Sequence, residues 1–111
     1  MSYYLMQFAY SADAWKALTE NPIDRADAVK ALAAQLGAQV LGFYYSFGEY
    51  DGVVLLDAPD DATAAAISMA AASAGHLKAT RTTPLLSVEQ TIEALKKASA
   101  AGYRARTREV R

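Results

Sequence analysis

The feature of this sequence that most constrains its fold is the order in which strand-like and helical segments alternate. Four runs of aliphatic, aromatic and β-branched residues read as strands, at residues 3–10, 39–47, 50–57 and 76–85. Helical apolar spacing fills the gaps after the first and third runs, most clearly at residues 26–36 and 62–74. The order strand, helix, strand, strand, helix, strand predicts a ferredoxin-like α+β fold, an antiparallel sheet with its helices on one face.

Capping residues and glycines mark the element boundaries. Ser11 or Asp13 is the candidate N-cap of a helix starting near Ala14, and Asp24 is the candidate for the helix at residues 26–36. A further amphipathic helix opens at Ser87. We therefore divide the chain into a ferredoxin-like domain at residues 1–86, an appended helix at residues 87–102 and a basic tail at residues 103–111.

Composition excludes several classes of function. Eleven Lys and Arg residues against twelve Asp and Glu leave no basic field, so we do not expect nucleic-acid binding. Cysteine is absent, which removes disulfides and thiolate ligands, and the presence of a single His argues against a metal site. No signal segment, membrane span or phosphate-binding loop is visible, so we expect a cytoplasmic protein with neither membrane partner nor cofactor.

The strands at the centre of the sequence are apolar on both faces. Residues 53–56 read Val-Val-Leu-Leu, and residues 41–47 also place large apolar side chains on both faces. Helices cover only one face of this fold, so something must cover the other. We expect a second copy of the chain, in a homodimer or higher oligomer, and the alternative is that the C-terminal helix folds back over the sheet.

Residues 48–51, Gly-Glu-Tyr-Asp, separate the two central strands and read as a hairpin turn. We expect Gly48 to take a positive φ in this turn. Tyr50 and Asp51 would then begin the second strand, where a carboxylate beside apolar residues needs partners.

Residues 43–54, FYYSFGEYDGVV, resemble the signature of the GYD domain family. The resemblance continues through residues 58–61, the Ala-rich helix, Gly75 and Arg81-Thr82, and covers roughly residues 3–86. It departs from the family at Gly52, where a larger apolar residue is usual, and at His76, where a small polar residue is usual. The resemblance implies ferredoxin-like units that join through their sheets, as in the dimeric α+β barrel group. It implies no particular activity.

The strand order brings one group of side chains to a single corner of the domain. We expect this corner to border a small-molecule pocket, with ligand-binding candidates Tyr10, Trp15, Tyr50, Asp51 and His76. Asp51 and His76 are the catalytic candidates, about 10 Å apart at the backbone. Each has a plainer interpretation: Asp51 as a turn carboxylate that accepts backbone hydrogen bonds, Tyr50 as a core aromatic, and His76 as an exposed or capping residue.

Two functions remain open from the sequence. The first is an oligomeric module that binds a small organic molecule or serves assembly. The second is a cofactor-independent, monooxygenase-like enzyme with Asp51 as acid or base, an idea that rests on fold analogy alone.

Overall fold

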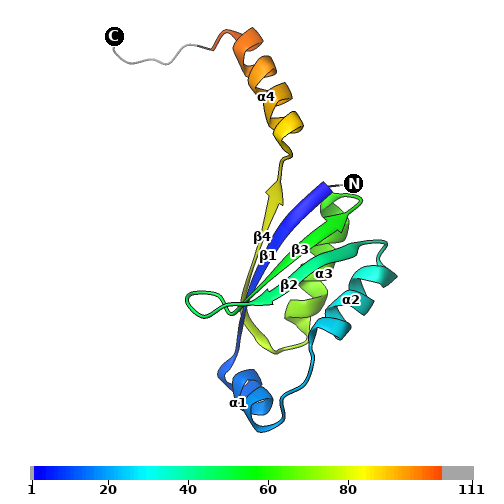
Figure 1. The fold of residues 1–111 in the computed structure, drawn as a ribbon, viewed down its shortest axis with the longest axis vertical. Helices are drawn as coiled ribbons and strands as arrows, with labels where there is room; N and C mark the ends of the chain where they lie inside the picture. Colours follow the sequence, from blue (N-terminus) through cyan, green and yellow to red (C-terminus); the bar gives the residue numbers. More distant parts are fainter. Residues whose placement is uncertain (1, 104–111) are drawn as a thin grey trace.

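The computed structural model describes residues 2–103, and these form one four-stranded antiparallel sheet with four helices (Figure 1). The elements follow in the order β1 (Ser2–Tyr10), α1 (Ala12–Glu20), α2 (Ala26–Gln35), β2 (Gln39–Tyr45), β3 (Gly52–Ala58), α3 (Asp61–Ser73), β4 (Leu77–Leu85) and α4 (Val88–Ala101). The strand order is β2-β3-β1-β4, with every neighbouring pair antiparallel. This is the ferredoxin-like order with β1 and β3 at the centre, so the expected fold class is confirmed.

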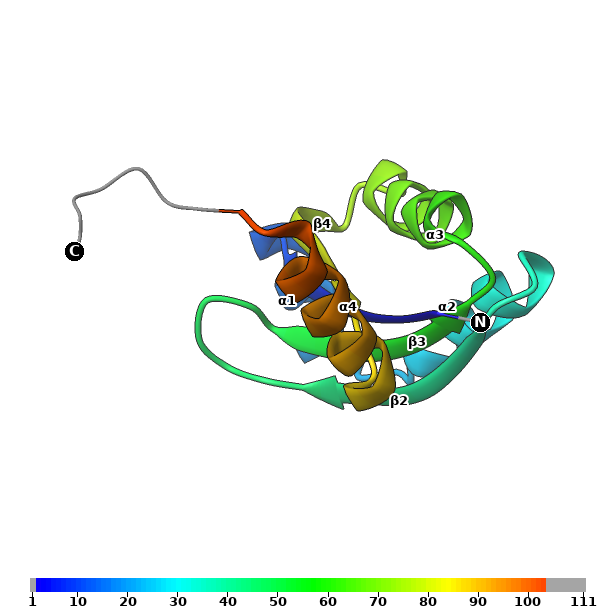
Figure 2. The same ribbon diagram turned by 90° about the horizontal axis from the view of Figure 1, so that it is seen from above.

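Alternation along the two central strands creates the core. In β1 the side chains of Tyr4, Met6 and Phe8 are buried, and their partners in β3 are Leu56, Val54 and Gly52. This set faces the helices. α2 packs against β2, and α3 packs against β4 and β3. Ala33 of α2 and Ala64 and Ile67 of α3 complete the core, and Figure 2 shows α3 lying over this face of the sheet.

Side-chain caps fix where the helices begin. The Ser11 Oγ accepts a hydrogen bond from the Ala14 backbone N–H at 3.1 Å, so Ser11, rather than Asp13, caps α1. Asp60 caps α3 by accepting the Thr63 N–H at 2.8 Å, and its hydrogen bonds from Thr63 lower the pKa of its carboxyl group. The Ser11 cap was readable from the sequence because it involves residues only three positions apart, whereas the expected Asp24 cap was wrong, because Arg25 occupies the N-cap position of α2.

The loop at residues 46–51 corrects two expectations about the central hairpin. β2 ends at Tyr45 and β3 begins at Gly52, so Tyr50 and Asp51 lie in the loop rather than in the second strand. The glycines with positive φ in the described chain are Gly37, Gly75 and Gly102, so the expected positive φ of Gly48 was wrong. The reason is loop length, because a tight two-residue turn needs left-handed backbone and this loop is longer. Two hydrogen bonds close it: the Ser46 N–H donates to the Asp51 carbonyl, and the Ser46 hydroxyl donates to the Tyr50 carbonyl, both at 2.8 Å.

The last helix stands away from the sheet. α4 continues the direction of β4 and projects beyond the body of the molecule (Figure 1), and it contains no buried residue. A capping box defines its first turn. The Ser87 Oγ accepts a hydrogen bond from the Gln90 backbone N–H, and the Gln90 Oε1 accepts one from the Ser87 backbone N–H. The face of the sheet opposite α2 and α3 is called the open face below. The expected alternative, in which the C-terminal helix folds back over this open face, is therefore not found in the structure. Of the expected basic tail, residues 104–111 lie outside the described residues.

Within residues 2–103, no helix combines the length and the apolar character that crossing a membrane requires.

Candidate ligand-binding site

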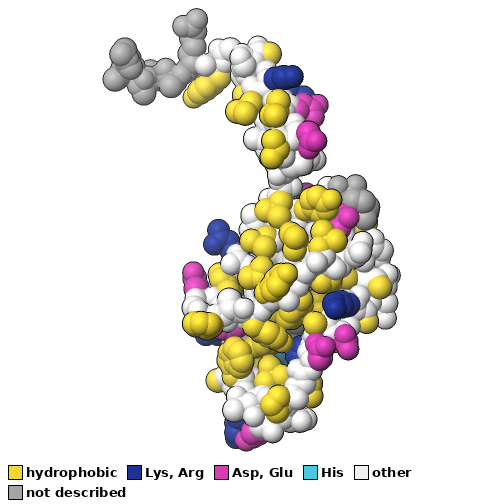
Figure 3. Space-filling view, viewed as in Figure 1, with side chains coloured by type: hydrophobic (Ala, Val, Ile, Leu, Met, Phe, Trp, Pro, Cys, Tyr) yellow, Lys and Arg dark blue, Asp and Glu magenta, His cyan; other side chains and the backbone are white. Residues whose placement is uncertain are grey.

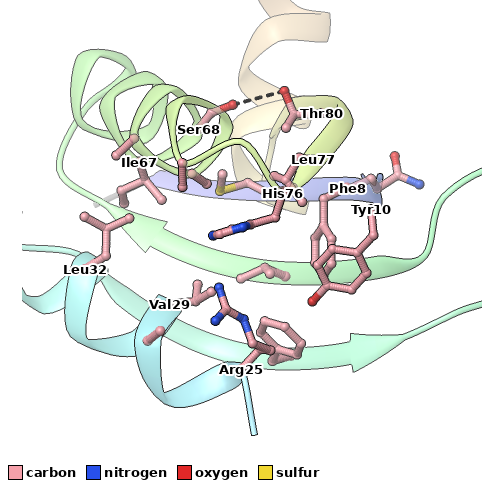
Figure 4. A pocket seen from close by; sticks show the side chains of 18 residues that line it. Phe8, Tyr10, Arg25, Val29, Leu32, Ile67, Ser68, His76, Leu77 and Thr80 are labelled. Atoms are coloured by element: carbon pink, nitrogen blue, oxygen red, sulfur yellow. Dashed lines mark hydrogen bonds between the residues drawn. The ribbon is translucent and has the colours of Figure 1, made fainter. Parts of the chain in front are cut away.

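A cavity of about 210 Å³ lies between α2, α3 and the helix-covered face of the sheet (Figure 4). The sheet contributes aromatic and aliphatic walls, and the two helices contribute mostly small or aliphatic side chains. The lining residues at the apolar end include Met6, Leu32, Val54 and Ile67. Hollows of this kind, apolar with a few polar groups, are typical of small-molecule sites.

The sequence of α3 explains why the space between the helices stays open. This helix and the residue after it line the cavity mainly with Ser68, Ala70, Ala71 and Ala74. None of these side chains is long enough to fill the gap between the two helices. Ser68 also donates a hydrogen bond from Oγ to Thr80 Oγ1 at 3.4 Å, which joins α3 to β4 at the edge of the cavity. The alanine-rich composition therefore leaves a hollow above the central strands.

Three polar side chains lie at one end of the cavity: Tyr10 from the end of β1, Arg25 from the start of α2, and His76 from the residue before β4. In Figure 4 the Arg25 guanidinium and the His76 imidazole turn toward each other across the hollow. Arg25 is half-buried and His76 is exposed. The cavity thus has one apolar end and one end rich in hydrogen-bond donors.

Tyr10 is the buried member of this polar end. Its side chain is 5% exposed, and its hydroxyl lies 3.3 Å from that of Tyr45. Burial is the main reason that the pKa of Tyr10 lies above its usual value, and the Tyr45 hydrogen bond acts in the same direction. The positive charge of Arg25 acts the other way and lowers the Tyr10 pKa. Tyr10 is therefore a neutral hydroxyl that can donate or accept a hydrogen bond.

An aromatic cluster supports the same end of the cavity. The Phe8 ring lies edge-on to Tyr10 at a centroid distance of 5.3 Å, and 5.7 Å from Phe43. Trp15 of α1 lies behind Tyr10, with the ring centroids 5.2 Å apart. Phe8, Tyr10 and Phe43 line the cavity, so the chain provides an aromatic wall suited to a flat ligand.

Asp51 organises this corner from behind Tyr10. Its Oδ2 accepts hydrogen bonds from the Tyr10 backbone N–H at 2.8 Å and from the Trp15 indole Nε1 at 3.2 Å. Its own backbone N–H donates to the Phe8 carbonyl at 2.7 Å. One carboxylate therefore joins the hairpin loop to the end of β1 and to α1. This is the arrangement of a structural acceptor.

The structure divides the five predicted site residues into two groups. Tyr10 and His76 line the cavity, whereas Trp15, Tyr50 and Asp51 are not among its lining residues. Trp15 and Asp51 contact Tyr10 from the other side, and the Tyr50 carbonyl accepts the Ser46 hydroxyl in the loop. The His76 carbonyl accepts the Ser11 N–H at 2.8 Å, which holds the start of β4 beside the end of β1.

Arg25 is the residue that sequence reasoning missed. It occupies the N-cap of α2 and makes no side-chain capping hydrogen bond. The N-terminal end of a helix dipole is unfavourable for a cation, and caps are normally Ser, Thr, Asp or Asn. An arginine at this position was therefore a signal that its side chain serves another purpose. Within the described chain, no group of three or more His, Asp or Glu side chains is placed to hold a metal ion.

Comparisons with known proteins agree with this fold. A family model described as the GYD domain matches residues 4–95. The match extends into α4, past the limit at residue 86 that the sequence motifs suggested. Among solved structures, the crystal structure of TTHA0845 from Thermus thermophilus is similar, with a TM-score of 0.53 and 19% identity over 79% of this chain and 96% of that chain. At this identity the similarity concerns the fold alone. A search of curated proteins found no match.

Proposed function

The chain belongs to the GYD domain family, and we propose that it is a binding module that takes a small, largely apolar organic molecule into the cavity between α2 and α3. The observation that carries this proposal is the cavity itself: a mostly apolar hollow with Tyr10, Arg25 and His76 at one end. The aromatic wall of Phe8, Tyr10 and Phe43 favours a ligand with a flat ring.

The volume of the cavity sets the size of the ligand. An engineered apolar cavity of about 150 Å³ holds one benzene molecule. The cavity here, at about 210 Å³, accommodates a single aromatic ring with a short substituent, or an aliphatic chain of similar volume. A ligand with several fused rings would project into solvent.

A matched pair of alanine substitutions on α3 tests the proposal. Ala71 lines the cavity, whereas its neighbour Ala72 is exposed and does not. Ala71→Leu should fill part of the hollow and weaken the binding of a neutral single-ring probe, benzamide, measured by saturation-transfer NMR. Ala72→Leu should bind like the native protein. Equal binding by the two variants would place the probe elsewhere, and no binding of benzamide to the native protein would contradict the proposal.

The alternative of a cofactor-independent enzyme, with Asp51 as acid or base, remains a prediction. The geometry favours the binding module, because Asp51 Oδ2 already accepts two hydrogen bonds and the carboxylate does not line the cavity. An acid or base must reach the proton that it transfers.

We also propose that the module assembles through the open face of its sheet, with a second copy as the partner. Register places large apolar side chains on this face, from Tyr3 and Leu5 of β1 to Val53 and Leu55 of β3. Tyr44 of β2 pairs with Val53 and is 70% exposed. Figure 3 views the sheet from this side and shows hydrophobic side chains gathered over it.

α4 supports the choice of a second copy as the partner. Val88, Ile92 and Leu95 form an exposed apolar stripe at helical spacing, and Figure 3 shows hydrophobic side chains of α4 on the same side of the molecule as the open sheet face. The helix, about 21 Å long at 1.5 Å per residue, is close to the length of a strand in the sheet. Two copies related by a two-fold axis can present sheet and helix to each other reciprocally.

Light scattering coupled to gel filtration tests the assembly. Val53→Lys places a charge at the centre of the open face and should convert the native oligomer to a monomer. Ala72→Lys, on the exposed side of α3, is the control and should leave the oligomer intact. A native protein that stays monomeric at micromolar concentration would refute this part of the proposal.

A further inference from the structure

We propose that the ligand of this cavity carries an anionic group, a carboxylate or a similar oxyanion, which Arg25 binds at the polar end. This inference rests on the proposed function, because it assumes that a small organic molecule occupies the cavity. It adds the chemical class of that molecule: an apolar body of about one ring with a negative charge at one end.

The first argument is the charge of Arg25. The side chain is half-buried and lines an apolar cavity, where an arginine without an opposite charge is costly. Within residues 2–103 the one ion pair found joins Lys97 and Glu93 on α4, so no carboxylate of the described chain neutralises Arg25. The guanidinium keeps its full set of N–H donors for a ligand.

The second argument is that nearby acidic side chains are engaged elsewhere. Asp24, the residue before Arg25, accepts the Ala26 backbone N–H at 2.8 Å. Asp51 accepts the Tyr10 N–H and the Trp15 indole. Both carboxylates are used to hold the backbone or a neighbouring ring. A carboxylate brought by the ligand would supply what the chain itself does not.

The third argument is the position of Arg25 relative to the other donors. The His76 imidazole faces the guanidinium across the hollow (Figure 4), and Tyr10 lines the same cavity. Arginine binds carboxylates through two parallel N–H···O bonds, which neutral donors do not reproduce. The apolar end of the cavity, lined by Met6, Leu32, Val54 and Ile67, suits an apolar body.

A comparison of benzoate with benzamide tests the inference. The two molecules have nearly the same shape, and only benzoate is charged at neutral pH. Titration calorimetry at low ionic strength should show benzoate binding roughly tenfold more tightly than benzamide, a free-energy difference of about 1.4 kcal/mol. Arg25→Gln should abolish this preference by weakening benzoate binding until it is close to that of benzamide. Arg25→Lys keeps the charge without the bidentate geometry and should retain part of the preference.

The control and the outcomes separate this inference from the proposed function. Lys30→Gln removes a positive charge from an exposed position of α2 that does not line the cavity, and it should keep the preference for benzoate. If benzamide and benzoate bind the native protein equally, and Arg25→Gln changes neither, the anionic class is wrong while the cavity remains a binding site. If neither molecule binds, the proposed function itself fails. Benzamide binding by Arg25→Gln also verifies that this variant is folded.

Discussion

Replacing Gly52 by alanine tests how tightly the aromatic wall of the cavity is packed. Gly52 opens β3 opposite Phe8 of β1, and a Cβ atom at this position would lie 2.1 Å from Phe8 Cζ and 2.5 Å from Cε2. Ordinary contacts begin near 3.4 Å, so the ring would have to move by about 1.3 Å. The glycine has no positive φ, and the effect of the alanine is therefore steric. The same contact explains why Gly52 departs from the larger residue expected from the family pattern.

The surroundings of Phe8 determine how large the effect is. The ring is 9% exposed and packs against Tyr10, Phe43 and Tyr45 at centroid distances of 5.3, 5.7 and 6.4 Å. The cavity is the side toward which it can yield. Overpacking destabilises the folded state by about 1–3 kcal/mol. Replacing glycine by alanine offsets about 0.4–1 kcal/mol of this, because alanine lowers the conformational entropy of the unfolded chain. We expect Gly52→Ala to lower the free energy of unfolding by about 1–2 kcal/mol and to weaken benzamide binding, because the displaced ring narrows the cavity.

Urea unfolding followed by Trp15 fluorescence and by circular dichroism measures the change. Gly48→Ala is the matched control: a Cβ at Gly48 meets no atom within 4 Å, and its free energy of unfolding should stay within about 0.5 kcal/mol of the native value. A second substitution, Phe8→Leu, removes the clashing ring atoms, so the double variant should lose less stability than the sum of the single variants. Equal stability of Gly52→Ala and Gly48→Ala, or simple additivity with Phe8→Leu, would refute the reasoning.

Two further predictions concern the corner behind the cavity. Asp51→Asn should lower the free energy of unfolding by about 1 kcal/mol, because two N–H donors lose a charged acceptor, and should leave benzoate affinity unchanged. Glu49→Gln in the same loop is the control. A loss of benzoate binding in Asp51→Asn would instead favour a role of Asp51 in ligand chemistry. Burial raises the pKa of Tyr10 above its usual 10.0, so its contribution to stability is complete below the unfolded-state value of about pH 10 and is lost as pH rises through the folded-state pKa. Tyr10→Phe should therefore flatten the alkaline decline in unfolding free energy, and an unchanged decline would show that other groups cause it.

The order and type of the elements follow from local patterns in the amino-acid sequence. Apolar periodicity predicted the strands and helices, and together with the strand order it predicted the sheet. Ser11 and Ser87 predicted two helix starts. Each of these features depends on residues within a few positions of one another, where spacing and side-chain chemistry act directly. The apolar character of both faces of β3 was readable for the same reason.

The candidate site, in contrast, depends on tertiary packing. Of the predicted corner, Tyr10 and His76 lie on the cavity, while Asp51 lies behind Tyr10 and holds it; their roles toward a ligand remain predictions. The cavity depends on how far apart α2 and α3 pack, and Arg25 lines it together with Tyr10 at the end of β1 and His76 before the start of β4. Such distances join residues far apart in the chain, and no local pattern encodes them. The projection of α4 is likewise a tertiary result, because an amphipathic helix shows which face is apolar but not which surface that face will meet.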